Sequence, residues 1–216
     1  MQRFFDIIFS SGALLVLSPI MVTCILILKF TGEKEIFYFQ ERYGLKGNKF
    51  KLVKFATMIK NSEKLGAGTI TVQNDSRVLP FGKFLRKSKI NELPQLINIF
   101  IGDMSVIGPR PLANKGFFYY SAQQRKIISS VRPGLSGMGS IAFRDEEKIL
   151  NNFKSTYDSL DDAYRDKIIP IKAKLEEWYV ANNSIYLYFK LIFMTILVVI
   201  DPNLEIKKFF PGIKYE

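Results

Sequence analysis

The chain has 216 residues, with 31 Lys and Arg against 20 Asp and Glu, so its formal net charge is +11. Its 48% hydrophobic residues exclude a disordered chain, and its length fits one domain with a short appended segment. The lack of histidine excludes imidazole bases and imidazole metal sites, and the single Cys24 excludes an intramolecular disulfide. Carboxylates, Lys, Tyr, Ser and Thr remain for chemistry.

An uncharged stretch from Ile7 to Leu28 is long enough to cross a bilayer, which takes about 20 apolar residues in a helix. Ser18 and Pro19 lie at its middle, where a proline removes one backbone hydrogen bond and kinks a helix. Basic residues flank both ends, and such flanks favour the cytoplasmic side. We therefore favour a re-entrant membrane helix over residues 1–30, broken at Ser18 and Pro19, in which the Ser18 hydroxyl bonds a carbonyl freed by the proline. A spanning helix with a mild kink is the alternative.

Residues 31–216 form the second expected unit, a compact cytoplasmic domain. Short, aromatic, roughly alternating segments predict strands at Ile36–Arg42 and Lys49–Phe55, and more weakly at Thr69–Val72. A turn that contains Gly44 and Gly47 joins the first two. Apolar periodicity predicts helices over Leu93–Phe100, Phe117–Ile128 and Asp161–Val180. Pro170 is expected to kink or divide the last of these. The expected fold class is α+β and mostly helical.

A second apolar stretch, Leu191–Ile200, is too short to span a bilayer as a helix. Aromatic residues that favour the boundary between water and lipid precede it, namely Trp178, Tyr179, Tyr186 and Tyr188. The pattern predicts an interfacial amphipathic helix or, equally, a plain buried helix.

Positive charge gathers early in the domain. From Lys29 to Lys60 there are eight basic residues against three acidic ones, and from Arg77 to Lys89 there are five basic residues and no acidic one. Such a surface suits anionic lipids, phosphates or nucleic acid. Beside a membrane segment lipid is the default, and without a zinc-finger or RNP-like motif we expect no nucleic-acid partner.

The segment Asn91–Phe100 is typical of a helix start, with Asn91 able to cap and Pro94 tolerated in the first turn. Glu92 would then lie at the positive end of the helix dipole, which is also a natural place for phosphate oxygens. An acidic residue there can simply stabilise the helix, so function needs further support.

That support comes from arginines next to prolines. Arg110 stands between Pro109 and Pro111, and Arg132 precedes Pro133. A proline fixes the local backbone and so holds a guanidinium ready for bidentate phosphate recognition. The structural alternative for either arginine is a bond to carbonyls of a tight turn.

At this point the sequence resembles the bacterial sugar transferases, also called monotopic phosphoglycosyl transferases. The resemblance covers nearly the whole chain, and its motifs are the Ser18-Pro19 apolar segment, Lys54–Met58, Phe84–Lys87, Asn91–Gln95, Gly102–Pro111 and Val131–Gly137. Several ordered matches of this kind are far more specific than any one alone.

The resemblance implies transfer of a sugar 1-phosphate from a UDP-sugar to polyprenyl (undecaprenyl) phosphate, with release of UMP and dependence on Mg²⁺. It places the protein on the cytoplasmic face of the bacterial inner membrane, in contact with anionic lipids, at the first membrane step of a glycoconjugate or polysaccharide pathway. The sugar, the polyprenol length, the pathway and the assembly state, including a homodimer, stay open.

Relatives carry an Asp-Glu pair in which the Asp attacks phosphorus and the Glu helps to position magnesium. Here Asn91 occupies the position of the Asp, and Ala56 stands where many relatives carry Arg. Three interpretations stay open. Glu92, or less readily Asp103, acts as the nucleophile in place of the Asp; the transfer is direct, without a covalent intermediate; or the substitution disables covalent catalysis. A non-catalytic membrane-surface assembly protein is the corresponding alternative function.

We expect Glu92 to be the key carboxylate, which binds magnesium and is able to attack phosphorus. Its neighbour Asn91, at the position of the family's Asp, is the second candidate catalytic residue. The expected phosphate and substrate contacts are Lys54, Arg86, Arg110, Pro111 and Arg132. Arg144 and Asp145 are further candidates in a charged run of the kind that usually forms a solvated face.

Overall fold

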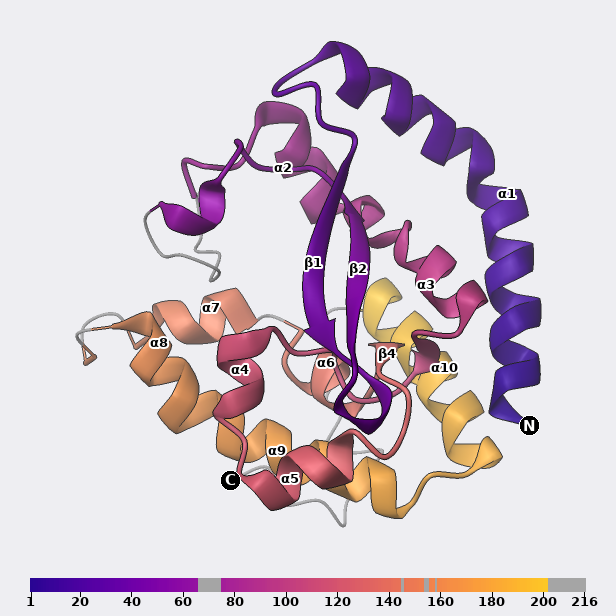
Figure 1. The fold of residues 1–216 in the computed structure, drawn as a ribbon, viewed down its shortest axis with the longest axis vertical. Coiled ribbons are helices and arrows are strands. Elements are labelled where there is room, and N and C mark those ends of the chain that lie inside the picture. The colour runs from indigo at the N-terminus through magenta and orange to yellow at the C-terminus, as the bar shows by residue number, and fades with distance from the viewer. Residues whose placement is uncertain (66–74, 145, 154–155, 158, 202–216) are drawn as a thin grey trace.

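The computed structural model of the protein describes residues 1–65, 75–144, 146–153, 156–157 and 159–201. Its α-helices are α1 (Gln2–Phe30), α2 (Pro80–Lys87), α3 (Gln95–Ile101), α4 (Asn114–Phe118), α5 (Ala122–Ile128), α6 (Met138–Ala142), α7 (Glu146–Asn151), α8 (Leu160–Ala163), α9 (Ile169–Ala181) and α10 (Ile185–Ile200) (Figure 1). The described part also contains two small two-stranded sheets and short 3₁₀ turns, so the expected α+β, mostly helical class is confirmed.

The first sheet is an antiparallel hairpin of β1 (Phe37–Tyr43) and β2 (Lys49–Phe55), which confirms the predicted strand pair. Its register runs from Phe37 opposite Phe55 to Tyr43 opposite Lys49. In the connecting turn Gly47 has a φ of 74°, which a residue without Cβ adopts at little cost. The third predicted strand, Thr69–Val72, lies outside the described residues.

The prediction of one helix over Phe117–Ile128 is wrong, because the chain forms α4 and α5 with a break between them. Ser121 caps α5 by accepting from the Gln124 N–H, and the Gln124 side chain accepts from the Ser121 N–H in return. This capping box starts a new helix inside the apolar pattern. The predicted division of Asp161–Val180 is confirmed, since Pro170 lies in the first turn of α9, after a π-helical turn at Tyr164–Ile168.

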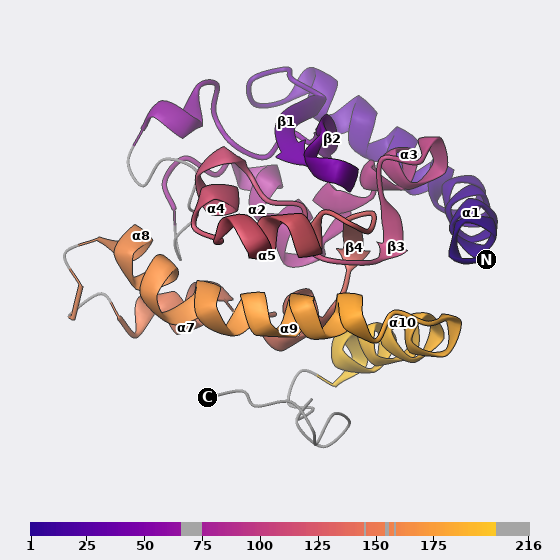
Figure 2. The ribbon, with the colours of Figure 1, turned by 60° about the horizontal axis from the view of Figure 1, so that its bottom comes forward.

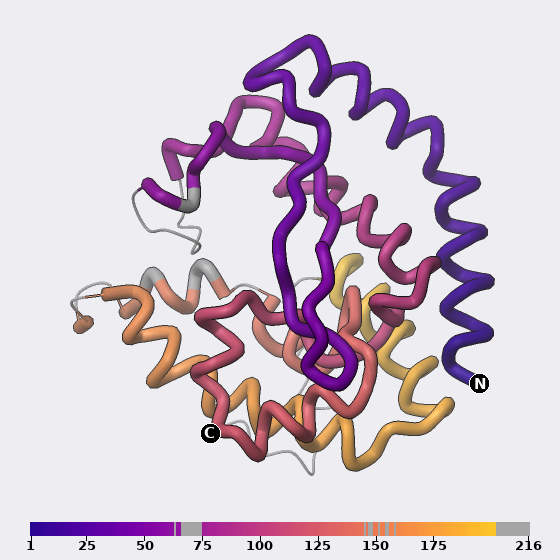
Figure 3. The backbone as a smooth tube through the Cα atoms, in the orientation of Figure 1, coloured from indigo at the N-terminus to yellow at the C-terminus, as the bar shows by residue number. Residues whose placement is uncertain are grey.

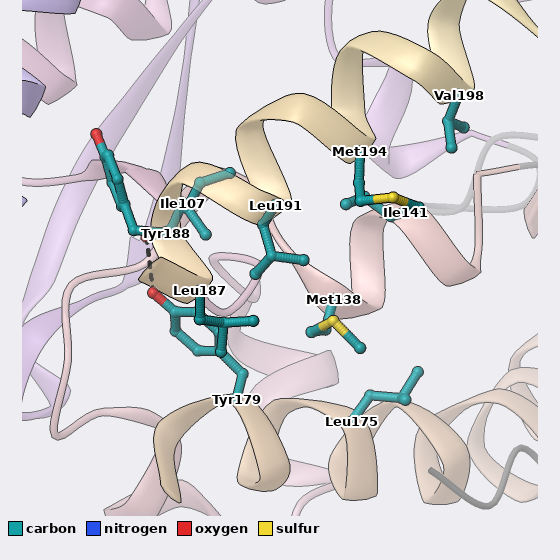
Figure 4. Close-up of a cluster of buried hydrophobic side chains, with 10 residues drawn as sticks. All are labelled: Ile107, Met138, Ile141, Leu175, Tyr179, Leu187, Tyr188, Leu191, Met194 and Val198. Carbon is teal, nitrogen blue, oxygen red and sulfur yellow. Dashed lines mark hydrogen bonds between the residues drawn. The ribbon is translucent and has the colours of Figure 1, made fainter. Parts of the chain in front are cut away.

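Helices α9 and α10 form a layer on one side of the domain, and Figure 2 shows α1, α3 and the β1–β2 hairpin on the other side. The largest apolar cluster joins α6, α9 and α10 to Ile107 (Figure 4). Within it, the Tyr179 hydroxyl donates to the Ile107 carbonyl at 3.2 Å. The prediction for Leu191–Ile200 is met in part: α10 is a helix with Leu191, Met194 and Val198 buried.

The long helix α1 is continuous from Gln2 to Phe30 and has Pro19 inside it. Its path bends midway, as the backbone tube in Figure 3 shows. The Ser18 hydroxyl donates to the Leu15 carbonyl at 2.8 Å, which is the carbonyl that Pro19 cannot reach with an N–H. This predicted compensation for the proline is confirmed.

Both ends of α1 contact the same domain. The Arg3 guanidinium donates to the Ile99 and Phe100 carbonyls in the last turn of α3. Near the other end, Cys24 and Leu28 are buried in a cluster with residues of β2 and α2. The apolar side chains just before the proline are far more exposed, with Leu15 at 77% and Val16 at 76%.

Asp6 fastens the first turns of α1 to the domain. It is 1% exposed, and its Oδ1 accepts from the Ser105 hydroxyl at 2.9 Å, the Val106 N–H at 2.9 Å and the Tyr188 hydroxyl at 2.8 Å. In Figure 4 the Tyr188 hydroxyl points away from the apolar cluster, consistent with this bond. One carboxylate oxygen thus joins α1 to the segment 105–107 and to α10.

Replacing Asp6 by Leu should destabilise the protein, because three buried donors would lose their shared acceptor. Unpaired buried donors cost about 1–3 kcal/mol each, so we expect a loss of roughly 3 kcal/mol or more. The melting temperature in detergent micelles should fall by roughly 6–12 °C. Asp6→Asn keeps an acceptor oxygen and should lose less; equal melting of Asp6→Leu and the unmodified protein would contradict this account.

Candidate active site

Glu92 and Lys54 meet at the centre of the candidate site. Lys54 lies near the end of β2, and Glu92 ends a 3₁₀ turn at Ile90–Glu92. The Lys54 Nζ lies 3.6 Å from the Glu92 Oε1, and 17% and 21% of the two side chains are exposed. A largely buried ion pair that keeps some access to solvent is well placed to meet a charged ligand.

These two side chains line a pocket. Its lining residues are Arg42, Leu52, Lys54, Glu92, Gln95, Arg110, Pro111, Gly134 and Leu135. The structure therefore brings together four residues that the sequence singled out, namely Lys54, Glu92, Arg110 and Pro111. It adds Arg42 and Gln95, whose part in the site the sequence interpretation missed. The hairpin register is the signal that identifies Arg42. Gln40 pairs with Leu52, so the residues two positions further along each strand, Arg42 and Lys54, lie on the same face of the hairpin.

A second sheet holds the loop of Arg110 in place. Strands β3 (Ser105–Ile107) and β4 (Gly134–Ser136) pair in parallel, and the sequence did not predict either of these short strands. The Gly108 N–H donates to the Ser136 carbonyl at 2.9 Å, and the Gly134 N–H donates to the Pro109 carbonyl at 2.8 Å. The two proline-bearing segments thus bond directly to each other.

Glycines allow this close approach. A Cβ on Gly134 would lie 2.1 Å from the Gly108 nitrogen, and a Cβ on Gly137 would lie 2.1 Å from the Gly108 carbonyl oxygen. Such contacts with backbone atoms cannot be relieved by a side-chain rotation. The glycines of both motifs are therefore needed for the geometry of the Arg110 loop.

The Arg110 backbone is fixed on both sides, while its guanidinium stays available. Its N–H donates to the Glu176 Oε1 at 3.3 Å, and the Arg42 guanidinium donates to the next carbonyl, that of Pro111, at 3.0 Å. Among the described residues the Arg110 guanidinium forms no hydrogen bond or ion pair. A fixed backbone and an unpaired guanidinium are what recognition of a phosphate requires.

The charges of the pocket shift one another. Burial opposes ionisation of Glu92, but Lys54, Arg110 and Lys89 outweigh it and lower the pKa of Glu92 to about 2. Burial lowers the pKa of Lys54 to about 8. The negative charge of Glu92 opposes this shift, and the positive charges of Arg110, Arg42 and Arg86 reinforce it. Burial and then Arg110 lower the pKa of Arg42 to about 10. At neutral pH the pocket therefore holds one carboxylate among several cations.

The expected capping role of Asn91 is wrong. Helix α3 begins at Gln95 with Pro94 as its N-cap, and no side chain caps it. Asn91 instead lies inside the 3₁₀ turn, because Lys89 in the left-handed region (φ 60°) starts that turn just before it. Its amide is buried, with Oδ1 lacking a hydrogen-bond partner among the described residues.

The remaining predicted residues lie around the pocket. Arg86, in the last turn of α2, is close enough to Lys54 to lower its pKa. The Arg132 Nε donates to the Gly102 carbonyl at 2.9 Å, which matches the structural alternative, and Arg132 does not line the pocket. Arg144 has a buried Nη1 without a partner in the described part of the chain. Asp145 lies outside the described residues.

Asp103 lies at the opposite end of α3 from Glu92. Its Oδ2 accepts from the Asn98 amide at 3.2 Å, and it does not line the pocket. The seven residues of α3 separate the two carboxylates by roughly 10 Å of helix, at about 1.5 Å per residue. Of the two alternative carboxylates, Glu92 is the one that faces the cations.

The described residues contain no group of three or more Cys, Asp or Glu side chains that could hold a metal ion alone. The ionised Glu92 carboxylate does fit the way Mg²⁺ is often bound, by one or two carboxylates together with substrate phosphates. The pocket thus fits a magnesium ion that arrives with a phosphate ligand.

Comparison with known proteins now bears on this site. The bacterial sugar transferase family matches residues 1–202. The chain is 32% identical over 203 residues to the UDP-glucose:undecaprenyl-phosphate glucose-1-phosphate transferase of Klebsiella pneumoniae, covering 90% of this chain and 39% of that protein. It is 35% identical over 159 residues to the exopolysaccharide production protein ExoY of Rhizobium meliloti (strain 1021), covering 67% of this chain and 70% of ExoY.

A third relative differs in its sugar. The chain is 31% identical over 213 residues to the UDP-N-acetylgalactosamine-undecaprenyl-phosphate N-acetylgalactosaminephosphotransferase of Aeromonas hydrophila, covering 92% of this chain and 43% of that protein. The chain belongs to the bacterial sugar transferase family, as its motifs predict. It spans about two fifths of the length of the Klebsiella and Aeromonas relatives.

Proposed function

We propose that the protein transfers a sugar 1-phosphate from a UDP-sugar to undecaprenyl phosphate and releases UMP. The observation that carries this proposal is the pocket that holds ionised Glu92, its partner Lys54 and Arg110, whose charge helps to keep Glu92 ionised. Relatives named as undecaprenyl-phosphate sugar phosphotransferases support it, and no relative supports the alternative of a non-catalytic assembly protein.

The cations of the pocket suit the charge of this reaction. In the proposed step the sugar-side phosphorus loses its bond to the bridging oxygen, which leaves with UMP, and gains a bond to an incoming oxygen. Arg110, Lys54 and Arg42 would bind the phosphate oxygens and stabilise the developing charge. We assign this attacking oxygen to Glu92, because the neutral amide of Asn91 is a poor nucleophile and Asp103 lies outside the pocket. In a second step a phosphate oxygen of undecaprenyl phosphate would attack the same phosphorus, break its bond to Glu92 and take up the sugar 1-phosphate.

Magnesium belongs to the same proposal. Glu92 would hold it together with the diphosphate, and the ion would neutralise phosphate charge when bound. The protein's own part is to keep Glu92 ionised, which the neighbouring cations do, and to align the diphosphate through Arg110.

The membrane arrangement rests on α1. This helix is long and apolar enough to cross a bilayer, yet both of its ends contact one domain and its exposed apolar residues include Leu15 and Val16, just before Pro19. A helix that enters and leaves by the same face fits these contacts better than a straight span. We propose this re-entrant insertion at the cytoplasmic face of the inner membrane, with the exposed apolar residues of α10 (Phe193, Ile196, Val199) at the lipid boundary.

The direct test is release of UMP by the protein in nanodiscs that contain undecaprenyl phosphate. UDP-glucose, UDP-galactose and UDP-N-acetylgalactosamine are supplied in turn, with Mg²⁺ or with EDTA. The proposal expects release with at least one sugar, dependent on both lipid and metal. Silence with the whole panel, together with activity in Asn91→Asp, would show a disabled nucleophile and overturn the assignment to Glu92.

Lys54 should give the reaction an alkaline limit. Its pKa is lowered to about 8, so the free enzyme loses the ammonium charge as pH rises through about 8, well below the usual range of lysine. We expect kcat/KM for the UDP-sugar to fall above pH 8, by about tenfold per pH unit at the limit. Lys54→Arg should move this fall to higher pH; an unchanged profile in that variant would contradict the role of Lys54.

A further inference from the structure

Glu176, in the middle of α9, is a buried carboxyl group that the proposed reaction does not use. It is 3% exposed, although it points toward the loop of the candidate site. Its Oε1 accepts from the Arg110 N–H at 3.3 Å, and the nearby N–H of Gly139 on α6 favours the ionised form of the carboxyl group and so opposes the rise of its pKa. The carboxyl group of Glu176 therefore lies where α6, α9 and the Arg110 loop meet.

The surroundings of Glu176 are unfavourable for a carboxyl group that only stabilises the fold. Its Oε2 has no hydrogen-bond partner among the described residues. Lys172, one turn earlier on α9 and 2% exposed, forms its ion pair with Glu146 instead. Burial raises the pKa of Glu176 to about 7. A buried group with an unpaired oxygen costs stability, and such groups persist where they serve function.

The neighbouring backbone is shaped to admit this side chain. A Cβ on Gly139 would lie 2.4 Å from the Glu176 Oε1, so any larger residue at this position would displace the carboxyl group. Other bonds of the Arg110 loop come from β4, from Arg42 and from the Tyr43 N–H, which donates to the Leu112 carbonyl at 3.0 Å, and they lie on either side of Arg110 itself. Glu176 is the partner of the Arg110 N–H and thus fixes the residue whose guanidinium faces the pocket.

We propose that Glu176 is a positioning residue for Arg110: its Oε1 holds the Arg110 backbone so that the guanidinium meets the diphosphate of the substrate. This inference rests on the proposed function for the identity of the ligand. A side chain that acts in this way needs an acceptor oxygen at Oε1 and needs no negative charge. Gln should therefore replace Glu176 well, whereas Leu, of similar size, should not.

The test is the affinity for UDP, measured by calorimetry on the full chain in micelles. The variants are Glu176→Leu, Glu176→Gln, Arg110→Ala and the double variant Glu176→Leu/Arg110→Ala. We expect Glu176→Leu to bind UDP about tenfold more weakly, Glu176→Gln to stay within about threefold, and Glu176→Leu to add no further loss once Arg110 is Ala. Glu177→Leu, at the next position of α9, is the matched control and should bind as the unmodified protein does.

Equal UDP affinity in Glu176→Leu and the unmodified protein would overturn the inference. A loss that persists in the Arg110→Ala background, or a loss matched by a fall in melting temperature and shared by Glu176→Gln, would also overturn it, because Glu176 would then act on the fold alone. Binding of UDP without UMP release from any UDP-sugar would contradict the proposed function, while the difference in affinity would still support the role of Glu176.

Discussion

Glu92→Gln should lower the rate of UMP release by at least about 10³-fold while the protein stays folded. The substitution keeps the size of the side chain and removes the only carboxylate that lines the pocket among the described residues. A carboxamide neither attacks phosphorus nor holds magnesium in the manner of a carboxylate, so both proposed roles are lost together. The measurement is the steady-state rate with saturating UDP-sugar, lipid and Mg²⁺, with circular dichroism to verify folding.

Glu41→Gln is the matched control for this variant. Glu41 lies on β1, in the hairpin that also carries Lys54; its side chain is 60% exposed and pairs with Lys49 at 2.6 Å. An exposed pair of this kind contributes little to stability, so this variant should retain full activity. Activity of Glu92→Gln close to that of Glu41→Gln would refute the assignment of Glu92.

Arg110→Ala should reduce kcat/KM for the UDP-sugar by about 10²–10³-fold, which corresponds to roughly 2.7–4 kcal/mol of lost transition-state stabilisation. The reason is its geometry: the backbone is held by β4, Arg42 and Glu176, and the guanidinium has no partner among the described residues. A guanidinium carried by a fixed backbone stabilises charge on phosphate oxygens with little reorganisation of the chain. The assay is initial-rate UMP release over a range of UDP-sugar concentrations.

Two further variants make this prediction specific. Arg110→Lys keeps the charge but loses bidentate geometry, so it should recover only part of the activity. Arg165→Ala removes an exposed arginine that pairs with Asp162 and Asp166, and it should have no effect. Full activity of Arg110→Lys would show that a point charge suffices and would contradict the bidentate contact.

The sequence predicted those parts of the molecule that depend on local chemistry. Alternating aromatic residues and two glycines identify the hairpin, and Ser18 next to Pro19 identifies both the bend in α1 and the bond that compensates for it. Prolines around Arg110 identify a fixed arginine, since φ of proline is restricted wherever it occurs. Arg110 could therefore be singled out from its prolines and Glu92 from its place at a predicted helix start, whereas Lys54 is expected only through the resemblance, which includes the motif Lys54–Met58.

The remaining parts depend on contacts between distant segments, which no local pattern contains. The three-residue strands β3 and β4 are too short to show an alternation, and they pair across nearly thirty residues of sequence. Glu176 looks like one more charged residue of an amphipathic helix, and only the fold shows that it meets the Arg110 N–H. Asn91 predicts the wrong start for α3, because this residue, which is suited to capping, lies four positions before the helix begins.

The most direct test of the central claim follows the phosphorus next to the sugar. UDP-sugar that carries ³²P at this phosphate is incubated with the protein, undecaprenyl phosphate and Mg²⁺, and the label is partitioned between water and organic solvent. Transfer of a sugar 1-phosphate predicts that the label enters the lipid fraction in step with UMP release. Label that stays in water as UDP, while the sugar itself reaches the lipid, would contradict the account.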